Sequence, residues 1–121
     1  MRFPILFDTG YAALSRLLLL PPNDAYVDLV DDEVRVRMAW GFRASFPRSA
    51  VRATALDNRR PLSRGAHGFA GKWLVNGSAR NIVRIELAPP QRGWVMGLPV
   101  RLAELRVSAV DPEGLRSALG A

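Results

Sequence analysis

Hydrophobic and polar residues alternate with a period of two along residues 34–46. The even positions are all apolar: Val34, Val36, Met38, Trp40, Phe42, Ala44 and Phe46. Because successive side chains of a β-strand point to opposite faces, this pattern predicts strand structure with one buried face and one face in water. A straight strand of this length would be unusual, so Gly41 is predicted to mark a bend or a tight reversal.

Similar but shorter patterns predict further strands along the chain. They cover residues 26–30, 51–56, 72–75, 82–87 and 102–109, with a weaker candidate at 94–98. Residues 31–33 (Asp-Asp-Glu) and 48–50 (Arg-Ser-Ala) are predicted turns, and Pro47 is predicted to end its strand. Residues 76–81 begin with Asn-Gly, which supplies the positive φ angles of a reversal, so a hairpin is predicted between 72–75 and 82–87. Ala88-Pro89-Pro90 is predicted to break the sheet.

The two ends of the chain carry helix signals. At the C-terminal end, Asp111 is a capping residue, Pro112 suits the first helical position and Glu113 suits the positive end of the helix dipole. This predicts a helix to about Leu119, which buries Leu115 and Leu119. At the other end, Asp8 or Thr9 would cap a short helix that runs to about Leu19, before Pro21-Pro22.

The order of these elements predicts the fold class. About seven strands followed by one helix are typical of a mainly β protein, a small barrel or orthogonal sandwich with the helix at one end. The length of 121 residues favours one domain. We expect residues 1–23 to form an N-terminal helical arm and residues 24–121 to form the barrel domain.

Charge is distributed unevenly along the chain. The net charge is +6, and Lys72 is the only lysine. Residues 34–106 carry fourteen basic side chains against three acidic ones, whereas the rest of the chain carries three basic and eight acidic ones. The basic body favours an anionic partner or a contact between copies of the protein. Arg35, Arg37 and Arg43 alternate with the apolar positions and are predicted to share one outer face, which forms a candidate basic surface.

Two stretches of the chain resemble a known fold family. Residues 26–47 give the order strand, acidic turn, strand, then a strand ending in Phe-Pro, and residues 105–112 (Leu-Arg-Val-Ser-Ala-Val-Asp-Pro) precede a leucine-rich helix. This arrangement resembles bacterial pleckstrin-homology-like (PH-like) domains. Residues 65–77 are similar to a segment of an uncharacterised protein family from high-GC bacteria. The resemblance implies a fold and no particular activity. PH-like domains that bind phosphoinositides carry basic residues in the first hairpin, where this chain has acidic ones.

The long connection from Asp57 to Gly71 is the best candidate binding segment in the sequence. It combines basic side chains, a histidine and nearby aromatic residues, and such groups can hold a phosphate, a carboxylate or a stacked base. The candidate partner-binding residues are Arg59, Arg60, Arg64, His67, Lys72 and Trp73. Glycines in tight turns and a structural histidine are the competing interpretation. The tryptophans Trp40, Trp73 and Trp94 are predicted to lie in the core or at its rim.

Several kinds of chemistry find no support in the sequence. The absence of cysteine excludes disulfides, thiolate metal sites and cysteine nucleophiles. His67 is the only histidine, no Gly-x-Ser-x-Gly elbow is present, and no phosphate-binding loop motif is complete. We therefore predict a non-enzymatic module of the bacterial cytoplasm, without catalytic residues, metal or cofactor and without a transmembrane segment.

Three functions follow as hypotheses. The first is protein–protein interaction or self-association. The second is sequence-independent binding of nucleic acid or anionic lipid by the arginine face. The third is a small-ligand carrier or enzyme that uses the glycine-rich connection.

Overall fold

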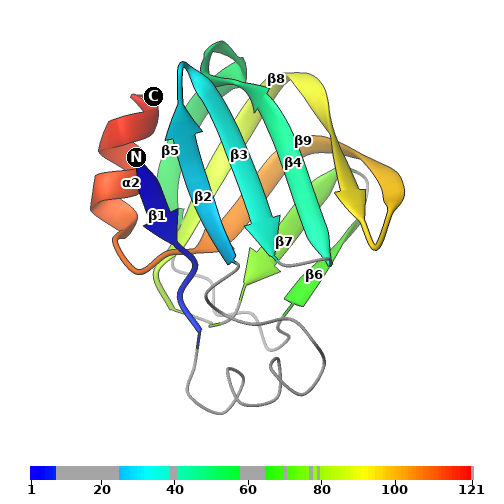
Figure 1. Ribbon diagram of the computed structural model, residues 1–121, viewed down its shortest axis with the longest axis horizontal. Helices are drawn as coiled ribbons and strands as arrows, with labels where there is room; N and C mark the ends of the chain where they lie inside the picture. The colour runs from blue at the N-terminus through cyan, green and yellow to red at the C-terminus, as the bar shows by residue number, and fades with distance from the viewer. Residues whose placement is uncertain are drawn as a thin grey trace.

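The computed structural model describes residues 1–7, 25–38, 41–57, 65–69, 71–76, 78 and 80–120, with the backbone alone for residues 65–69. Most of the described residues are in strands, and a single α-helix follows the last strand (Figure 1). This confirms the predicted fold class, a mainly β, barrel-like domain with a C-terminal helix.

Nine strands, one short 3-10 helix and one α-helix make up the described part of the fold. In chain order they are β1 (Arg2–Pro4), β2 (Ala25–Val30), β3 (Glu33–Met38), β4 (Phe42–Pro47), η2 (Arg48–Ala50), β5 (Val51–Asp57), β6 (Gly65–Phe69), β7 (Lys72–Asn76), β8 (Ile82–Val95), β9 (Leu98–Ser108) and α2 (Pro112–Leu119).

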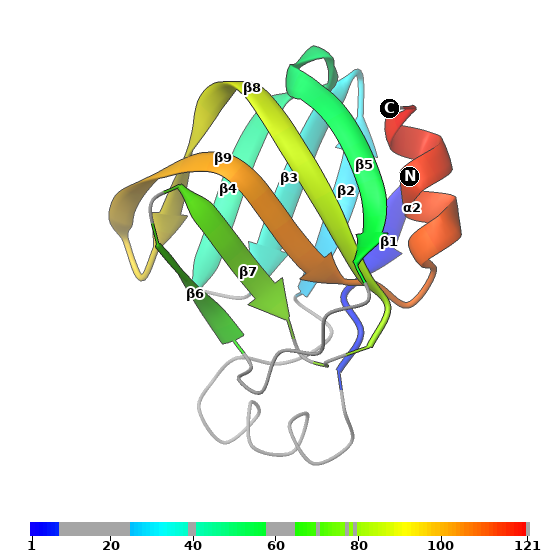
Figure 2. The same ribbon diagram turned by 180° about the vertical axis from the view of Figure 1, so that it is seen from behind.

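All nine strands belong to one curled sheet. Its order is β1-β2-β3-β4-β8-β9-β7-β6, and β5 pairs with β8 outside this path. The long strand β8 holds the sheet together, because its first half pairs with β5 and its last residues pair with β4. Figures 1 and 2 show the resulting half-barrel, with the β2–β3–β4 meander on one side and β5, β8, β9 and β7 on the other.

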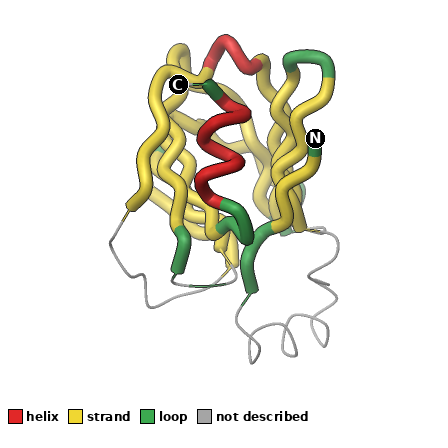
Figure 3. Tube along the Cα trace, turned by 90° about the vertical axis from the view of Figure 1, so that its left-hand side faces the viewer, coloured by secondary structure: helices red, strands yellow, loops and turns green. Residues whose placement is uncertain are grey.

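The two sides of the half-barrel meet near the chain ends. Ile5 and Ala109 form an isolated β-bridge, and the Ser108 hydroxyl donates a hydrogen bond to the Leu6 carbonyl at 2.8 Å. Helix α2 lies along the remaining opening (Figure 3), with Leu115 and Leu119 in the core. The Asp111 carboxylate accepts a hydrogen bond from the Gly114 amide at 3.0 Å. The predicted cap, helix and buried stripe are therefore confirmed.

The core lies inside the curl and contains the apolar positions of the alternating pattern. Val34, Val36, Met38, Phe42 and Phe46 are each at most 2% exposed. Because these five side chains alternate with exposed residues, the period of two was a correct indicator of the buried face. The chain reverses between β3 and β4 at the predicted Gly41, whose amide donates to the Met38 carbonyl.

The predicted hairpin between residues 72–75 and 82–87 is wrong. β7 pairs in parallel with β9 and antiparallel with β6, and β9 lies between β7 and β8. The Asn-Gly signal is local, whereas the insertion of β9 between the two strands is a long-range pairing.

The prediction that Ala88-Pro89-Pro90 breaks the sheet is also wrong. β8 continues through these residues, and its register with β9 shifts between Glu86 and Gln91. The two prolines occupy a bulge, where the loss of a backbone donor is tolerated. Pairing of β8 with β9 resumes at Gln91, and the two strands form a hairpin through the turn at Met96-Gly97.

Two further segments differ from their predicted structure. The connection from Asp57 to Gly71 contains strand β6, so it is not one continuous loop. Residues 2–4, assigned to the N-terminal arm, form β1 and pair with β2. The helix predicted from Asp8 or Thr9 to Leu19 lies outside the described residues. Within the described part of the chain, no helix has the length and apolar character needed to cross a membrane.

Candidate functional site

An open groove of about 560 Å³ crosses the outer face of β2, β3, β4 and the second half of β8. We call it the arginine groove. Its lining residues are Tyr26, Arg35, Val36, Arg37, Arg43, Ala44, Ser45, Gln91, Arg92 and Trp94. Four of these described lining residues are arginines and none is acidic. This face of the sheet is turned toward the viewer in Figure 1.

Strand register places the central residues of the groove in one row. Tyr26 lies opposite Arg37, Arg37 lies opposite Arg43, and Arg43 lies opposite Trp94. Residues paired across neighbouring strands project from the same face of a sheet. The row therefore has two arginines in the middle and an aromatic residue at each end.

The aromatic residues at the two ends carry cations on their rings. The guanidinium carbon of Arg43 is 5.8 Å from the Trp94 ring centroid, and that of Arg2 is 3.9 Å from the Tyr26 ring centroid. Both distances are within the range of a cation–π interaction. These contacts keep each guanidinium group beside an aromatic ring at one end of the row.

The pairing of Arg37 with Arg43 has an energetic cost. Like charges directly opposite each other on a sheet destabilise it by some tenths of a kcal/mol, up to about 1 kcal/mol. Both side chains are exposed, so water screens part of this repulsion. An anion bound between the two guanidinium groups would offset the rest of this repulsion.

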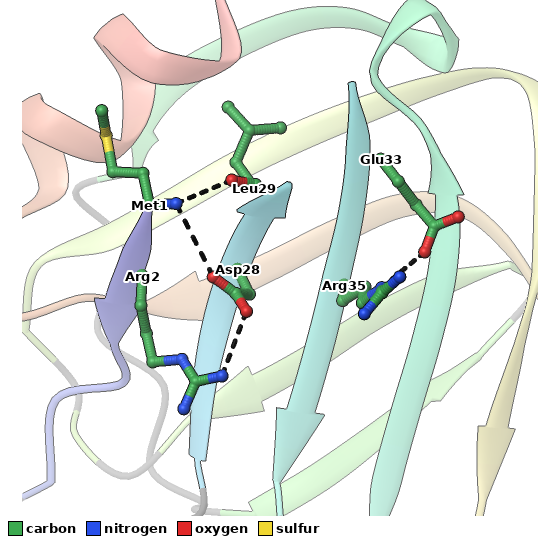
Figure 4. A network of polar contacts seen from close by, with 6 residues as sticks. All are labelled: Met1, Arg2, Asp28, Leu29, Glu33 and Arg35. Carbon is green, nitrogen blue, oxygen red and sulfur yellow. Dashed lines mark hydrogen bonds and ion pairs between the residues drawn. The ribbon is translucent and has the colours of Figure 1, made fainter. Parts of the chain in front are cut away.

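Acidic groups lie at the rim of the groove rather than inside it. Glu33 pairs with Arg35, and the Asp28 carboxylate accepts a hydrogen bond from Arg2 at 3.1 Å (Figure 4). Hydrogen bonds from Arg35 and then from the Ser45 hydroxyl hold the pKa of Glu33 below its ordinary value of 4.5. The same pairing raises the pKa of Arg35. Arg35 is therefore partly neutralised, whereas Arg43 and Arg92 form no ion pair with any of the described residues.

The basic surface continues across β8 to β9. A second open hollow is lined by Pro90, Gln91, Arg92, Pro99, Val100 and Arg101, and it shares Gln91 and Arg92 with the arginine groove. Arg92 and Arg101 are register partners. The basic surface thus extends from Arg35 on β3 to Arg101 on β9.

The opposite half of the sheet carries charged residues that are balanced. Arg106 Nη1 lies 3.5 Å from Asp57 Oδ2, and Arg106 Nε lies 3.9 Å from Glu104 Oε2. The Asp57 side chain is only 5% exposed. Lys72 is the register partner of Glu104, so a cation and an anion lie directly across from each other. Like charges also face each other here, since Arg84 is the register partner of Arg106 and Glu86 that of Glu104. On this surface, however, the ion pairs of Arg106 offset that repulsion.

The structure places the sequence-based candidates unevenly. Arg35, Arg37 and Arg43 come together in the groove. Arg59, Arg60 and Arg64 lie outside the described residues, and His67 is described only as a backbone position in β6, opposite Leu74. Lys72 is exposed on the outer face, whereas Trp73 is half-buried and packs against the core. The two candidates of the glycine-rich segment with described side chains thus occupy opposite faces of β7.

Two groove residues, Tyr26 and Arg92, were not among the sequence-based candidates. A third, Trp94, was predicted to lie in the core or at its rim, whereas it is half-buried on the outer face and lines the groove. Arg92 and Trp94 alternate with Gly93, which is buried; a Cβ there would lie 2.9 Å from the Leu102 side chain. This alternation is a strand signal with a basic and aromatic outer face. Only the weaker strand candidate at residues 94–98 was predicted here, because the prolines just before Gln91 were interpreted as a break in the sheet.

The chemistry of the groove is that of an anion site. Arginine presents several N–H donors in a planar fork that matches phosphate and carboxylate oxygens, and aromatic faces add stacking surface. Among the residues described, no group of three or more histidine, aspartate or glutamate side chains could hold a metal ion. Compared with known protein families, curated proteins and solved structures, the chain matches none of them.

Proposed function

We propose that this protein is a non-enzymatic binding module that holds the phosphate groups of an anionic partner in the arginine groove. The observation that carries the proposal is the row Tyr26–Arg37–Arg43–Trp94, in a groove with no acidic residue among its described lining. Phosphates of a lipid surface or of a nucleic acid have the same charge and oxygen geometry. Contacts to phosphate oxygens carry no base-specific information, so binding of this kind is independent of nucleotide sequence.

The expected strength of the interaction follows from the number of arginines. Near an anionic lipid surface each Lys or Arg contributes about 1 kcal/mol, and the effect falls off within a Debye length. Four groove arginines with Arg101 would therefore give useful but salt-sensitive affinity. Arg35 contributes least, because Glu33 already occupies part of its donor capacity.

The test compares two double variants with the same change in net charge. Arg43→Gln with Arg92→Gln removes groove charges, whereas Arg52→Gln with Arg80→Gln removes exposed charges that line no part of the groove. Binding is measured to phosphatidylglycerol-containing vesicles and to a mixed-sequence single-stranded oligonucleotide, at about 50 and 200 mM salt, a range that strongly weakens phosphate contacts.

We expect the groove variant to lose roughly 30-fold in affinity for the bound anion, which is about 2 kcal/mol for two charges. The control variant should stay within about threefold of the wild-type protein, since charges outside the groove act only at long range. Equal losses in the two variants would show that net charge alone governs binding. Failure of the wild-type protein to bind either probe would remove the proposal.

Self-association or capture of a protein partner remains a second candidate function. In the described part of the sheet, β6 pairs only with β7, so its other backbone edge is available for an added strand. Light scattering at the same two salt concentrations tests this function. A defined oligomer that persists at high salt would support pairing through a sheet edge, and a monomer at all concentrations would count against it. The bacterial PH-like assignment and the cytoplasmic location remain predictions.

A further inference from the structure

The tip of the β8–β9 hairpin exposes an apolar surface directly beside the arginine groove. Met96 is 63% exposed and Leu98 is 69% exposed, the highest values among the described large hydrophobic residues apart from Met1. From Trp94 to Val100 the chain has no charged side chain, and only the Trp94 indole is polar. Figures 1 and 2 show this hairpin at the side of the barrel, beyond β4. Runs of exposed apolar residues like this one are unusual unless they serve a function.

The turn itself contains a residue that is unfavourable for its conformation. Met96 and Gly97 both have positive φ, 49° and 83°, as in the tight reversals that favour Asn-Gly. Methionine rarely adopts this conformation, and its side chain is mostly in water here. An asparagine would adopt this positive φ angle at a lower cost. The choice of an exposed apolar residue at a strained position points to an interaction of the side chain with something outside the protein.

The backbone of the tip is already hydrogen-bonded. Val95 pairs with Leu98 across the turn, and the Met96 amide donates to the Gly41 carbonyl at 3.0 Å. An apolar environment is costly for unpaired backbone groups, so this pairing lowers the cost of moving the tip out of water. The bond to Gly41 also anchors the tip to the β3–β4 turn and keeps it beside the groove.

Arginine residues lie behind the apolar tip, at positions that the strand register fixes. Arg92 and Arg101 are register partners behind it, and Arg43 lies across from Trp94. Arg101 is three positions after Leu98, which is about 10 Å along a strand. The polar headgroup layer of a bilayer is about 5–8 Å thick on each side. With Met96 and Leu98 at the acyl boundary, the backbone of these arginines would lie just outside the headgroup layer, and their long side chains would reach its phosphates. Trp94 would lie at the interface that tryptophan prefers.

We infer that the β8–β9 hairpin is a membrane-docking element, which inserts Met96 and Leu98 into the interface of a bilayer containing anionic lipids while the arginines of the groove contact its phosphates. This inference rests on the proposed phosphate binding and names its partner. Nucleic acid offers phosphates without an adjoining apolar layer, so it would leave the exposed Met96 and Leu98 side chains unexplained. From Leu87 to Ala103 the chain has no acidic residue that would oppose the approach to an anionic surface.

The test uses vesicle sedimentation with the 121-residue protein and three variants. Met96→Ser with Leu98→Ser removes the apolar tip, and Val30→Ser with Val110→Ser is the matched control, since these residues are 38% and 53% exposed elsewhere. Met96→Asn is the third variant, because it should raise thermal stability by relieving the turn and yet weaken binding. Vesicles contain phosphatidylcholine with or without phosphatidylglycerol, and an oligonucleotide is assayed in parallel.

We expect the tip variant to lose at least tenfold in affinity for anionic vesicles and to lose nearly all binding that resists high salt. The control should change less than twofold. Fluorescence should be quenched by lipids brominated in the acyl chain, and the quenching should fall in a Trp94→Phe variant. Wild-type affinity in the tip variant, or in Met96→Asn, would overturn membrane docking by the hairpin.

The two proposals fail in different ways. Oligonucleotide binding without vesicle binding would overturn the membrane inference and leave the phosphate-binding groove in place. If vesicle binding is lost in the tip variant but unchanged in the groove variant, the contact is apolar and the groove does not recognise phosphate. Binding to neither probe would remove both.

Discussion

The two outer faces of the sheet have the same alternating pattern, but their arginines have different neighbours. On the face of β3 and β4, Arg37 lies opposite Arg43 and the described lining of the groove holds no acid. On the face of β9, Arg106 lies within ion-pair distance of both Asp57 and Glu104. Both faces alternate polar residues with core residues, and both place like charges opposite each other in the register, as Arg84 and Arg106 show on the second face. The difference is that carboxylates lie beside Arg106 and none lines the groove.

Charged residues on one face therefore stabilise the fold, and those on the other face can bind a partner. The Asp57 carboxylate is nearly buried, so its cation has to remain in place for the fold to be stable. The groove arginines are exposed, so an external anion can reach them. The same residue type thus stabilises the protein on one face and is available for binding on the other.

Replacing one arginine on each face gives the largest expected contrast. Arg106→Met leaves a nearly buried carboxylate with one cation fewer and should lower the free energy of unfolding by about 2 kcal/mol. Arg43→Met removes an exposed charge opposite another arginine and should change stability by less than about 0.5 kcal/mol. Urea unfolding measures both values. Equal losses in the two variants would mean that the faces do not differ in this way.

Reversing the charge at the same two positions should give effects of opposite sign. Arg43→Glu replaces a like-charge pair with Arg37 by an attractive one and should raise stability by about 0.5 kcal/mol, while abolishing anion binding. Arg106→Glu places a third carboxylate beside Asp57 and Glu104 and should destabilise the protein. Thermal unfolding at low salt checks the two signs, and a loss of stability in Arg43→Glu would contradict the comparison.

The smallest expected effect concerns the rim of the groove. Glu33→Gln frees Arg35 from its ion pair and should strengthen anion binding roughly threefold, within the contribution of about one charge. Glu113→Gln is the control, because Glu113 pairs with Arg116 on α2, away from the groove. A titration of vesicles or oligonucleotide compares the two affinities, and identical affinities would show that Glu33 does not compete for Arg35.

The pH dependence of that effect follows from the direction of the pKa shift. The pKa of Glu33 is lowered, so its pairing with Arg35 stabilises the folded state above the ordinary carboxyl pKa and is lost only as pH falls through the lower folded value. Arginine stays charged throughout the physiological range. The threefold gain of Glu33→Gln should therefore be constant from pH 5.5 to 8, as measured by repeating the titration.

Much of the fold could be predicted from local patterns. The period of two in residues 34–46, the reversal at Gly41 and the cap at Asp111 each depend on neighbours within a few positions, and the structure confirms all three. Strand partners were less predictable. The supposed hairpin of β7 and β8 failed because β9, which follows both in the chain, pairs between them.

The candidate site was likewise predictable only in part from local patterns. Alternation placed Arg35, Arg37 and Arg43 on one face, because side-chain direction in a strand is a local property. Tyr26, Arg92 and Trp94 join them only through the pairing of β2 with β3 and of β4 with β8. Two of these residues follow a pair of prolines that normally ends a strand, and here the sheet continues past the bulge.

The sequence by itself determined the class of fold, the buried face of each main strand, the C-terminal helix and the basic character of the body. These properties depend on side-chain periodicity, capping and composition, which act over short distances along the chain. The tertiary structure alone decided which arginines are neutralised and which are gathered into a groove beside an apolar hairpin tip. Strand register sets those neighbours, and register depends on how distant segments fill one common core.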